Sequence, residues 1–245
     1  MTSSRSKAKP RQAVSQPAAH RTFISAKTKN QKEYIRSIIE NDITICSGPS
    51  GTGKSLVGLG VALENLFRQD KPQNKIYITR PMVATSEREF PHLKGSLIEK
   101  LLPYFAPIIS NLKDLLNSES QLERMLENET IVMQAIELAR GFTFKNCYVL
   151  ITESQNMTVP QSVMAVTRLG ENCKMIIEGD TDQKDIRGYD GLSYLKSRLR
   201  NNPELCGVVD LGPEDILRHP LIGKILAKLD YKGAAYDYDE LGAIE

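Results

Sequence analysis

The chain has 245 residues, 40% of them hydrophobic and 25% charged, with a formal net charge of +2. These values are ordinary for a globular chain, so they exclude a compositionally disordered protein and favour one sizeable domain with tails. No run approaches the roughly 20 apolar residues of a membrane span, and the N-terminus has no apolar signal-peptide core. We expect a cytoplasmic protein, or one of the host cytoplasm if a phage encodes it.

The two ends of the chain differ in charge from its body. Residues 1–22 hold five basic residues and no acidic one, which predicts a disordered basic leader. Residues 230–245 are mostly acidic where charged, which predicts a flexible acidic tail. The folded domain is therefore expected over residues 23–229. The four cysteines form no CxxC pair, which indicates free thiols and argues against a zinc site.

Regular elements alternate along the first half of this domain. Apolar residues at helical spacing predict a helix over residues 27–42. The β-branched run ITICS at 43–47 precedes a glycine and predicts a buried strand. Leucines at helical spacing predict a helix over 54–69, and KIYITRP at 75–81 predicts a strand that ends at proline.

The second half continues this alternation after an insertion. Residues 95–127 predict a helical insertion interrupted by Pro103 and Pro107, and residues 130–138 are ambiguous between strand and helix. Three further strands and a final helix are predicted over 147–153, 174–180, 207–212 and 213–229. Strands alternating with helices indicate an α/β fold with a doubly wound, mainly parallel sheet. We expect one domain with a helical insertion.

GPSGTGKS, between the first strand and its helix, matches the phosphate-loop pattern GxxxxGK[ST] at every fixed position. Glycines allow the backbone to surround a phosphate, and the helix N-terminus attracts it. We expect this loop to bind ATP, with Lys54 at the β- and γ-phosphates and Ser55 at Mg²⁺. The predicted binding residues are Gly48, Pro49, Ser50, Gly51, Thr52, Gly53, Lys54 and Ser55. With this loop, the fold class becomes a P-loop NTPase, which by itself leaves small-molecule kinases, GTPases and motor ATPases open.

Polar residues after two later strands favour hydrolysis over phosphotransfer. Glu153 follows the apolar run YVLIT, where an acid can orient and deprotonate water. Asp180 and Gln183 follow the next run, where polar groups can sense the γ-phosphate. A GTPase would need a guanine-specifying NKxD element, which the sequence lacks. A small-molecule kinase would need an arginine-bearing lid, and the mixed charges of residues 95–127 make a poor candidate.

Several further motifs occur in a fixed order, among them ITRP, IEKLLPY, ESQNMTVPQ, TRLGENCKMIIEGDTDQ, DGLSYL and ILRHPLI. Together with the phosphate loop they resemble the PhoH-like family, P-loop ATPases similar to the core of superfamily 1 helicases, which implies a P-loop NTPase fold of the RecA/ASCE-like type. The resemblance spans about residues 26–229. It implies that strand 174–180 lies between strands 43–47 and 147–153, with Asp180 beside the phosphates. It also implies Mg²⁺-dependent ATP use, action on single-stranded RNA or DNA, and a homo-oligomeric ring such as a hexamer.

The resemblance extends to three residues outside the phosphate loop. Gln31 resembles the glutamine that reads the adenine edge, although without the family it would equally suit an exposed helix position. Arg168 in TRLG and Arg218 in LRHP are candidates for sensing the γ-phosphate, within one subunit or as a finger into a neighbour. Either arginine could instead form a structural salt bridge.

Two positions depart from the family pattern: Thr152 stands where that pattern has an aspartate, and Phe142 where it tends to have an arginine. The predicted metal residues are therefore Ser55, Thr152 and Asp180. Without the aspartate, the charge-assisted hydrogen bond to a metal-bound water is lost. Such a loss costs about 1.5–3 kcal/mol, or roughly ten- to a hundredfold in rate or affinity. The sequence thus predicts a slow, helicase-like ATPase in which Glu153 activates water. The alternative is a nucleotide-gated oligomeric binding module with negligible turnover.

Overall fold

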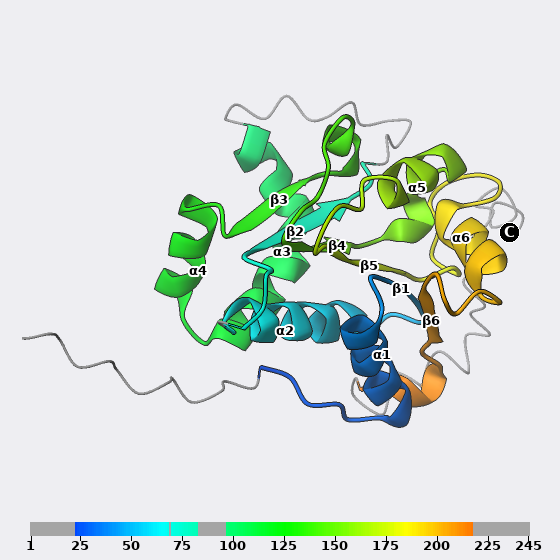
Figure 1. Ribbon diagram of the computed structural model, residues 1–245, viewed down its shortest axis with the longest axis horizontal. Coiled ribbons are helices and arrows are strands. Elements are labelled where there is room, and N and C mark those ends of the chain that lie inside the picture. The colour runs from blue at the N-terminus through cyan, green and yellow to red at the C-terminus, as the bar shows by residue number, and fades with distance from the viewer. Residues whose placement is uncertain (1–22, 69, 83–96, 218–245) are drawn as a thin grey trace, which may run out of the picture.

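A single parallel sheet of six strands organises the protein, whose computed structural model describes residues 23–68, 70–82 and 97–217 (Figure 1). Neighbouring strands follow the order β3-β2-β4-β5-β1-β6, and every pair is parallel. The strands are β1 (Ile43–Ser47), β2 (Lys75–Arg80), β3 (Ile131–Ala135), β4 (Cys147–Ile151), β5 (Lys174–Gly179) and β6 (Gly207–Asp210). The predicted α/β fold with a parallel sheet is confirmed.

Six α-helices and three short 3₁₀ helices accompany the strands within the described ranges. The α-helices are α1 (Lys29–Glu40), α2 (Lys54–Leu66), α3 (Leu97–Leu116), α4 (Glu119–Glu127), α5 (Val159–Val166) and α6 (Gly191–Leu199). The 3₁₀ helices are η1 (Ile136–Ala139), η2 (Ser154–Asn156) and η3 (Pro213–Asp215). Polar side chains set where several helices begin: Thr28 accepts a hydrogen bond from the first turn of α1, and Thr158 forms a capping box with Gln161 in α5.

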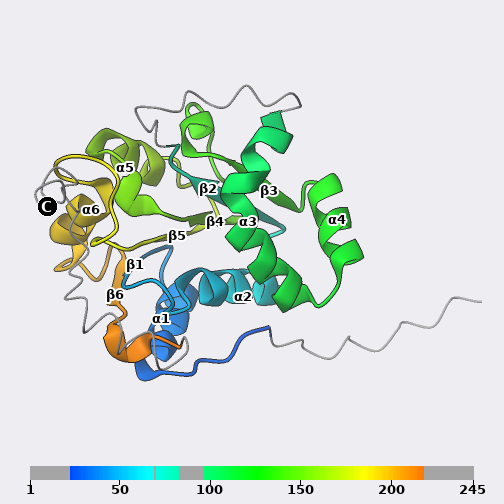
Figure 2. The same ribbon diagram turned by 180° about the vertical axis from the view of Figure 1, so that it is seen from behind.

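Helices cover both faces of the sheet, as a doubly wound fold requires. On one face, Ile76, Leu150 and Ile176 pack in a core that includes side chains of α1, α2, α3 and α4. On the other face, Val149 and Ile177 pack in a second core with α5 and α6. Successive strand residues thus enter opposite cores, which explains the continuous apolar runs of β4 and of Met175–Ile177 in β5. Figure 2 shows α3 and α4 near β2 and β3, with α5 and α6 toward the opposite side.

The strand order brings three chain segments to one edge of the sheet. β5 lies between β1 and β4, as the family resemblance implied. Because the strands are parallel, the segments after β1, β4 and β5 emerge together at their carboxyl ends, where open α/β sheets bind ligands. These segments begin with Gly48, Thr152 and Asp180. A backbone hydrogen bond of 3.2 Å from Gly48 N to Gly179 O extends the contact past the strands.

The helical insertion differs from its prediction. α3 continues through Pro103 and Pro107, so the expected interruption is wrong. A proline inside a helix costs about 3 kcal/mol, but α3 buries Phe105 and Leu112 in the core, and this packing offsets the loss.

The structure also describes two segments at the margins of the sheet whose predictions were ambiguous or differ from it. The ambiguous segment 130–138 forms edge strand β3 followed by η1. The final helix predicted over 213–229 begins instead with the 3₁₀ turn η3, and residues 218–245 lie outside the described part of the chain. The predicted leader over 1–22 and tail over 230–245 also lie outside it. None of the described helices combines the length and apolarity of a membrane span.

Phe105→Ala should destabilise the fold more than a comparable surface change. The Phe105 side chain is 0% exposed, so truncation leaves a cavity where α3 meets the core. We expect the free energy of unfolding to fall by about 3–5 kcal/mol in urea denaturation. Ile39→Ala, at a position 54% exposed on α1, should cost less than about 1 kcal/mol. Equal losses for both variants would show that α3 contributes little to the core.

Candidate phosphate and magnesium site

The loop between β1 and α2 has the conformation that a phosphate-binding loop needs. Gly51 and Gly53 have φ angles of 89° and 80°, in the region that favours glycine. Gly53 is the N-cap of α2 and supplies no side-chain hydrogen bond to the first turn. The first N–H groups of a helix have no partner within it, and they attract anions. The loop therefore presents the positive end of α2 to the edge of the sheet.

Lys54 holds its ammonium group inside the loop. Its Nζ donates a hydrogen bond of 2.9 Å to the carbonyl oxygen of Pro49 and another to that of Gly48. The loop is also braced internally, because the buried Thr52 hydroxyl donates to Pro49 O at 2.8 Å. The cationic group is thus placed at the loop, where a phosphate oxygen can compete for it.

Glu178, near the end of β5, is a site residue that the sequence analysis missed. Its side chain is 1% exposed, yet it lines the pocket in front of the loop. Its Oε1 accepts a hydrogen bond from the Ser55 hydroxyl, and its Oε2 accepts one of 3.2 Å from the buried Tyr34 hydroxyl. Burial raises the pKa of Glu178 to about 7, although Ser55, Lys54 and Tyr34 act to lower it. A buried acid in an apolar strand is rare and was the signal available in the sequence.

Glu153 reaches the same pocket from the end of β4. Its backbone is left-handed, with φ of 52°, an uncommon conformation for this residue type. The buried Gln155 fixes its side chain, because Gln155 Nε2 donates to Glu153 Oε2 at 2.7 Å. Gln155 Oε1 also accepts from the N–H of Asp180 at 3.1 Å, and its Nε2 donates to Gln183 O at 3.2 Å. Gln155 therefore links the segments after β4 and β5.

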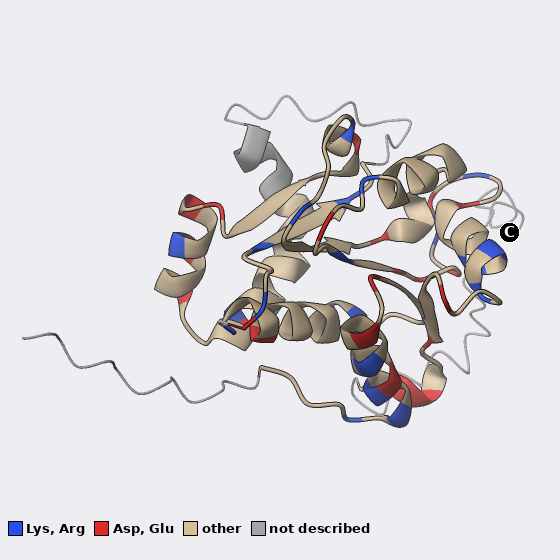
Figure 3. Cartoon of the chain, viewed as in Figure 1, with Lys and Arg blue, Asp and Glu red and all other residues tan. Residues whose placement is uncertain are grey.

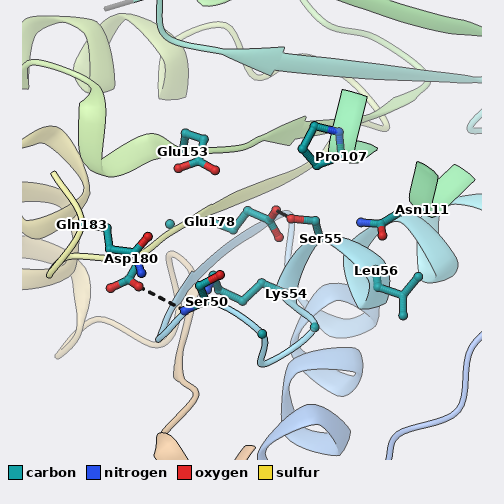
Figure 4. Close-up of a pocket in the computed structure, with 13 residues that line it drawn as sticks. Ser50, Lys54, Ser55, Leu56, Pro107, Asn111, Glu153, Glu178, Asp180 and Gln183 are labelled. Carbon is teal, nitrogen blue, oxygen red and sulfur yellow. Dashed lines mark hydrogen bonds between the residues drawn. The ribbon is translucent and has the colours of Figure 1, made fainter. Parts of the chain in front are cut away.

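Asp180 contacts the first half of the phosphate loop, whereas Ser55 is the last residue of that loop. Its Oδ2 accepts a hydrogen bond of 3.1 Å from the N–H of Ser50, drawn as a dashed line in Figure 4. Its Oδ1 accepts one of 3.1 Å from the N–H of Asp182. The picture places Asp180 beside Ser50, whereas Glu178 lies beside Ser55. The metal role predicted for Asp180 stays a prediction.

These groups surround one pocket of about 440 Å³, a size within the range of small-molecule sites. Its lining comprises Ser50, Gly51, Gly53, Lys54, Ser55, Leu56, Pro107, Asn111, Glu153, Glu178, Gly179, Asp180 and Gln183. The structure therefore brings together most of the predicted phosphate loop with three predicted polar residues, Glu153, Asp180 and Gln183. Thr152 is 4% exposed and is not part of this lining.

Gln31 and the two predicted arginines lie elsewhere. The buried Gln31 joins α1 to the loop, since its Nε2 donates to Thr52 O at 2.9 Å and its Oε1 accepts from Lys27 N at 2.8 Å. Its predicted contact with adenine stays a prediction. Arg168 lies before β5, at the amino ends of the strands, whereas the phosphate loop lies at their carboxyl ends. Arg168 would therefore have to contact the γ-phosphate bound by a neighbouring subunit. Arg218 lies outside the described residues.

Phe142, where the family pattern tends to have an arginine, joins an aromatic cluster. Its ring lies 5.6 Å from that of Tyr77 and 5.1 Å from that of Phe144, measured between centroids. Tilted and edge-on contacts of this kind are favourable for aromatic rings. The side chain still leaves 41% of its surface exposed.

The polar groups of the pocket fit Mg²⁺ bound together with a nucleotide. Within the described ranges no group of three or more His, Cys, Asp or Glu residues forms a metal cluster by itself. Mg²⁺ usually takes one or two protein ligands and completes its shell with waters and phosphate oxygens. The Ser55 hydroxyl and the neighbouring Glu178 carboxylate provide such a partial set.

Comparison with known proteins decides the family. A family model described as PhoH-like protein matches residues 23–230. The chain belongs to the PhoH-like family. Among its relatives, a PhoH-like protein of Bacillus subtilis (strain 168) is 36% identical over 209 residues, which cover 84% of this chain and 64% of that protein. Protein PhoH of Escherichia coli (strain K12) is 34% identical over 207 residues, which cover 83% of this chain and 57% of that protein.

The family resemblance inferred from the sequence motifs is thus confirmed. This chain spans less than two thirds of the length of these two curated relatives. Among solved structures, a Sulfolobus solfataricus SWI2/SNF2 ATPase core in complex with dsDNA matches with a TM-score of 0.38 and 18% identity. That match covers 67% of this chain and 34% of the other. A similarity this low says nothing about what the PhoH-like chain does.

Proposed function

We propose that this PhoH-like protein is a Mg²⁺-dependent ATPase that acts on single-stranded RNA or DNA. One observation carries the ATPase part: a single pocket joins the phosphate loop to carboxylates from two adjacent strands. Lys54 and the N–H groups of the loop would bind the phosphates. Glu153, fixed by Gln155, would orient a water molecule and accept its proton at a carboxylate oxygen.

Magnesium bound beside Ser55 would supply positive charge for the phosphate oxygens during transfer to water. Asp180 would respond to the γ-phosphate through the loop, because its carboxylate holds the N–H of Ser50. Gln183 would contribute from the same segment, since it lines the pocket. Arg168 of a neighbouring subunit, together with Arg218, would complete the site in a ring of subunits.

The nucleic-acid and ring parts of the proposal rest on the family resemblance. The charges of α1 give these two parts no independent support, because basic and acidic side chains are mixed along this helix (Figure 3). Arg36, for example, pairs with Glu40 at 2.8 Å. A strongly basic face would have favoured nucleic acid, and α1 does not provide one.

A second candidate function is a nucleotide-gated oligomeric module with negligible turnover, which the uncharged Thr152 favours. Phosphate release from Mg²⁺-ATP, measured with and without single-stranded RNA or DNA, separates the two candidates. We expect slow release that one nucleic acid accelerates. ATP binding that drives assembly without any phosphate release would establish the binding module instead. Release that neither nucleic acid changes would remove the nucleic-acid part of the proposal.

A further inference from the structure

The carboxylate missing at position 152 has a counterpart on the neighbouring strand. β4 and β5 are parallel, with Ile151 opposite Ile177. The next positions along the two chains are Thr152 and Glu178, so the two residues are lateral neighbours at the edge of the sheet. Both are buried, but only Glu178 lines the pocket. A carboxyl group is therefore present beside the usual position, one strand closer to β1, and a bound cation would favour its charged form.

The contact between Glu178 and Ser55 places this charge at the metal side of the pocket. The Ser55 hydroxyl donates to Glu178 Oε1, which leaves the hydroxyl oxygen available to a cation. Neighbouring ligands in an octahedral Mg²⁺ shell are about 3 Å apart. A carboxylate within hydrogen-bond distance of one ligand can therefore accept hydrogen bonds from waters beside it. Tyr34 holds the other oxygen of Glu178 and fixes its orientation.

The other two acids of the pocket are engaged differently. Both carboxylate oxygens of Asp180 accept backbone N–H groups, from Ser50 and Asp182. Glu153 accepts from Gln155 and is the residue proposed above to activate water. Among the carboxylates lining the pocket, the one with a hydrogen bond from Ser55 is that of Glu178.

We propose that Glu178 is the carboxylate that supports Mg²⁺ in this site, in place of the residue at position 152. The proposal rests on the ATPase function proposed above and identifies how its metal is held. The site would then keep its metal although Thr152 is uncharged, because the supporting carboxylate is on β5 and not after β4. The proposal also gives a role to a buried acid that the water-activating chemistry does not use.

The test is the magnesium dependence of binding a fluorescent ATP analogue. Glu178→Gln keeps the size of the side chain and one acceptor oxygen, but removes its charge and turns the other oxygen into an amide donor. We expect the Mg²⁺ concentration for half-maximal binding to rise about ten- to a hundredfold, with binding in EDTA unchanged. Glu33→Gln, an exposed position on α1, is the matched control and should leave both values unchanged.

Moving the carboxylate back provides the second arm. Thr152→Asp added to Glu178→Gln should recover most of the lost magnesium affinity. Thr152→Asp alone should change it only a few-fold, because the wild-type site already has its carboxylate. A ten- to hundredfold gain from Thr152→Asp alone would overturn the proposal, and this result does not depend on whether Glu178→Gln folds.

The remaining outcomes separate this proposal from the function on which it rests. If wild-type protein binds the analogue and Glu178→Gln keeps the same magnesium dependence, the role of Glu178 is wrong and the ATPase function stands. Equal weakening by Glu178→Gln with and without Mg²⁺ would likewise assign Glu178 a structural role. If wild-type protein does not bind the analogue at any magnesium concentration, the proposed function itself fails.

Discussion

Lys54→Ala is expected to abolish ATP hydrolysis and to weaken ATP binding. The Lys54 ammonium lies within the phosphate loop, held by the carbonyl groups of Gly48 and Pro49. Its hydrogen bonds to phosphate would be charge-assisted, and they would strengthen as negative charge develops during transfer. We expect the rate of phosphate release to fall by at least about 100-fold. The measurement is steady-state phosphate release combined with titration of a fluorescent ATP analogue.

Lys113→Ala is the matched control for this substitution. Lys113 forms a surface ion pair with Glu119 and does not line the pocket, so its loss should leave both measurements unchanged. Phosphate release that persists in Lys54→Ala at the wild-type rate would mean that the loop does not bind the reacting phosphate, or that the activity comes from a contaminant.

Glu153→Gln is the second substitution with a large expected effect, and it should separate binding from turnover. Gln fills the same space but cannot accept a proton from water at pH 7, so hydrolysis should fall about 10²- to 10⁴-fold. Binding of Mg²⁺-ATP should be retained, because the loop, and not Glu153, would bind the phosphates. Rapid phosphate-release kinetics and analogue binding measure the two effects on the same preparation.

Glu123→Gln provides the same change of chemistry outside the pocket, at an exposed position on α4. We expect it to leave the rate of hydrolysis unchanged. A Glu153→Gln variant as active as wild type would assign water activation to another group, and Asp180 would be the next carboxylate to test. Loss of ATP binding in Glu153→Gln would instead indicate that Glu153 supports the fold of the loop.

Local sequence patterns predicted most of the sheet and the phosphate loop. The apolar runs of β1, β4 and β5 are buried on both faces, and such runs are visible without knowledge of their neighbours. β3 was ambiguous because only its first and last residues are buried, as befits a strand at the edge of the sheet. The prolines of α3 predicted a break that tertiary packing prevents, and a local pattern cannot report that packing.

The site was predicted less completely than the fold, because its polar contacts join distant segments. Glu178 reads as one residue of a strand until the strand order places it beside both Thr152 and Ser55. Gln155 likewise gained its role only when the segment after β5 was placed next to it. Sequence separations of 123 and 25 residues divide Glu178 from Ser55 and Gln155 from Asp180. Motif spacing was enough to predict the phosphate loop, whereas these two contacts could be recognised only once the strand order was known.

A single-turnover measurement tests the ATPase claim most directly. Wild-type protein in excess over radiolabelled ATP, with saturating Mg²⁺, should convert the bound ATP to ADP and phosphate. Its rate should exceed that of Glu153→Gln by about 100-fold or more, with the same fraction of ATP bound in both. Bound ATP that stays intact in wild-type protein, or decays equally in both proteins, would contradict the account and leave a nucleotide-binding module in its place.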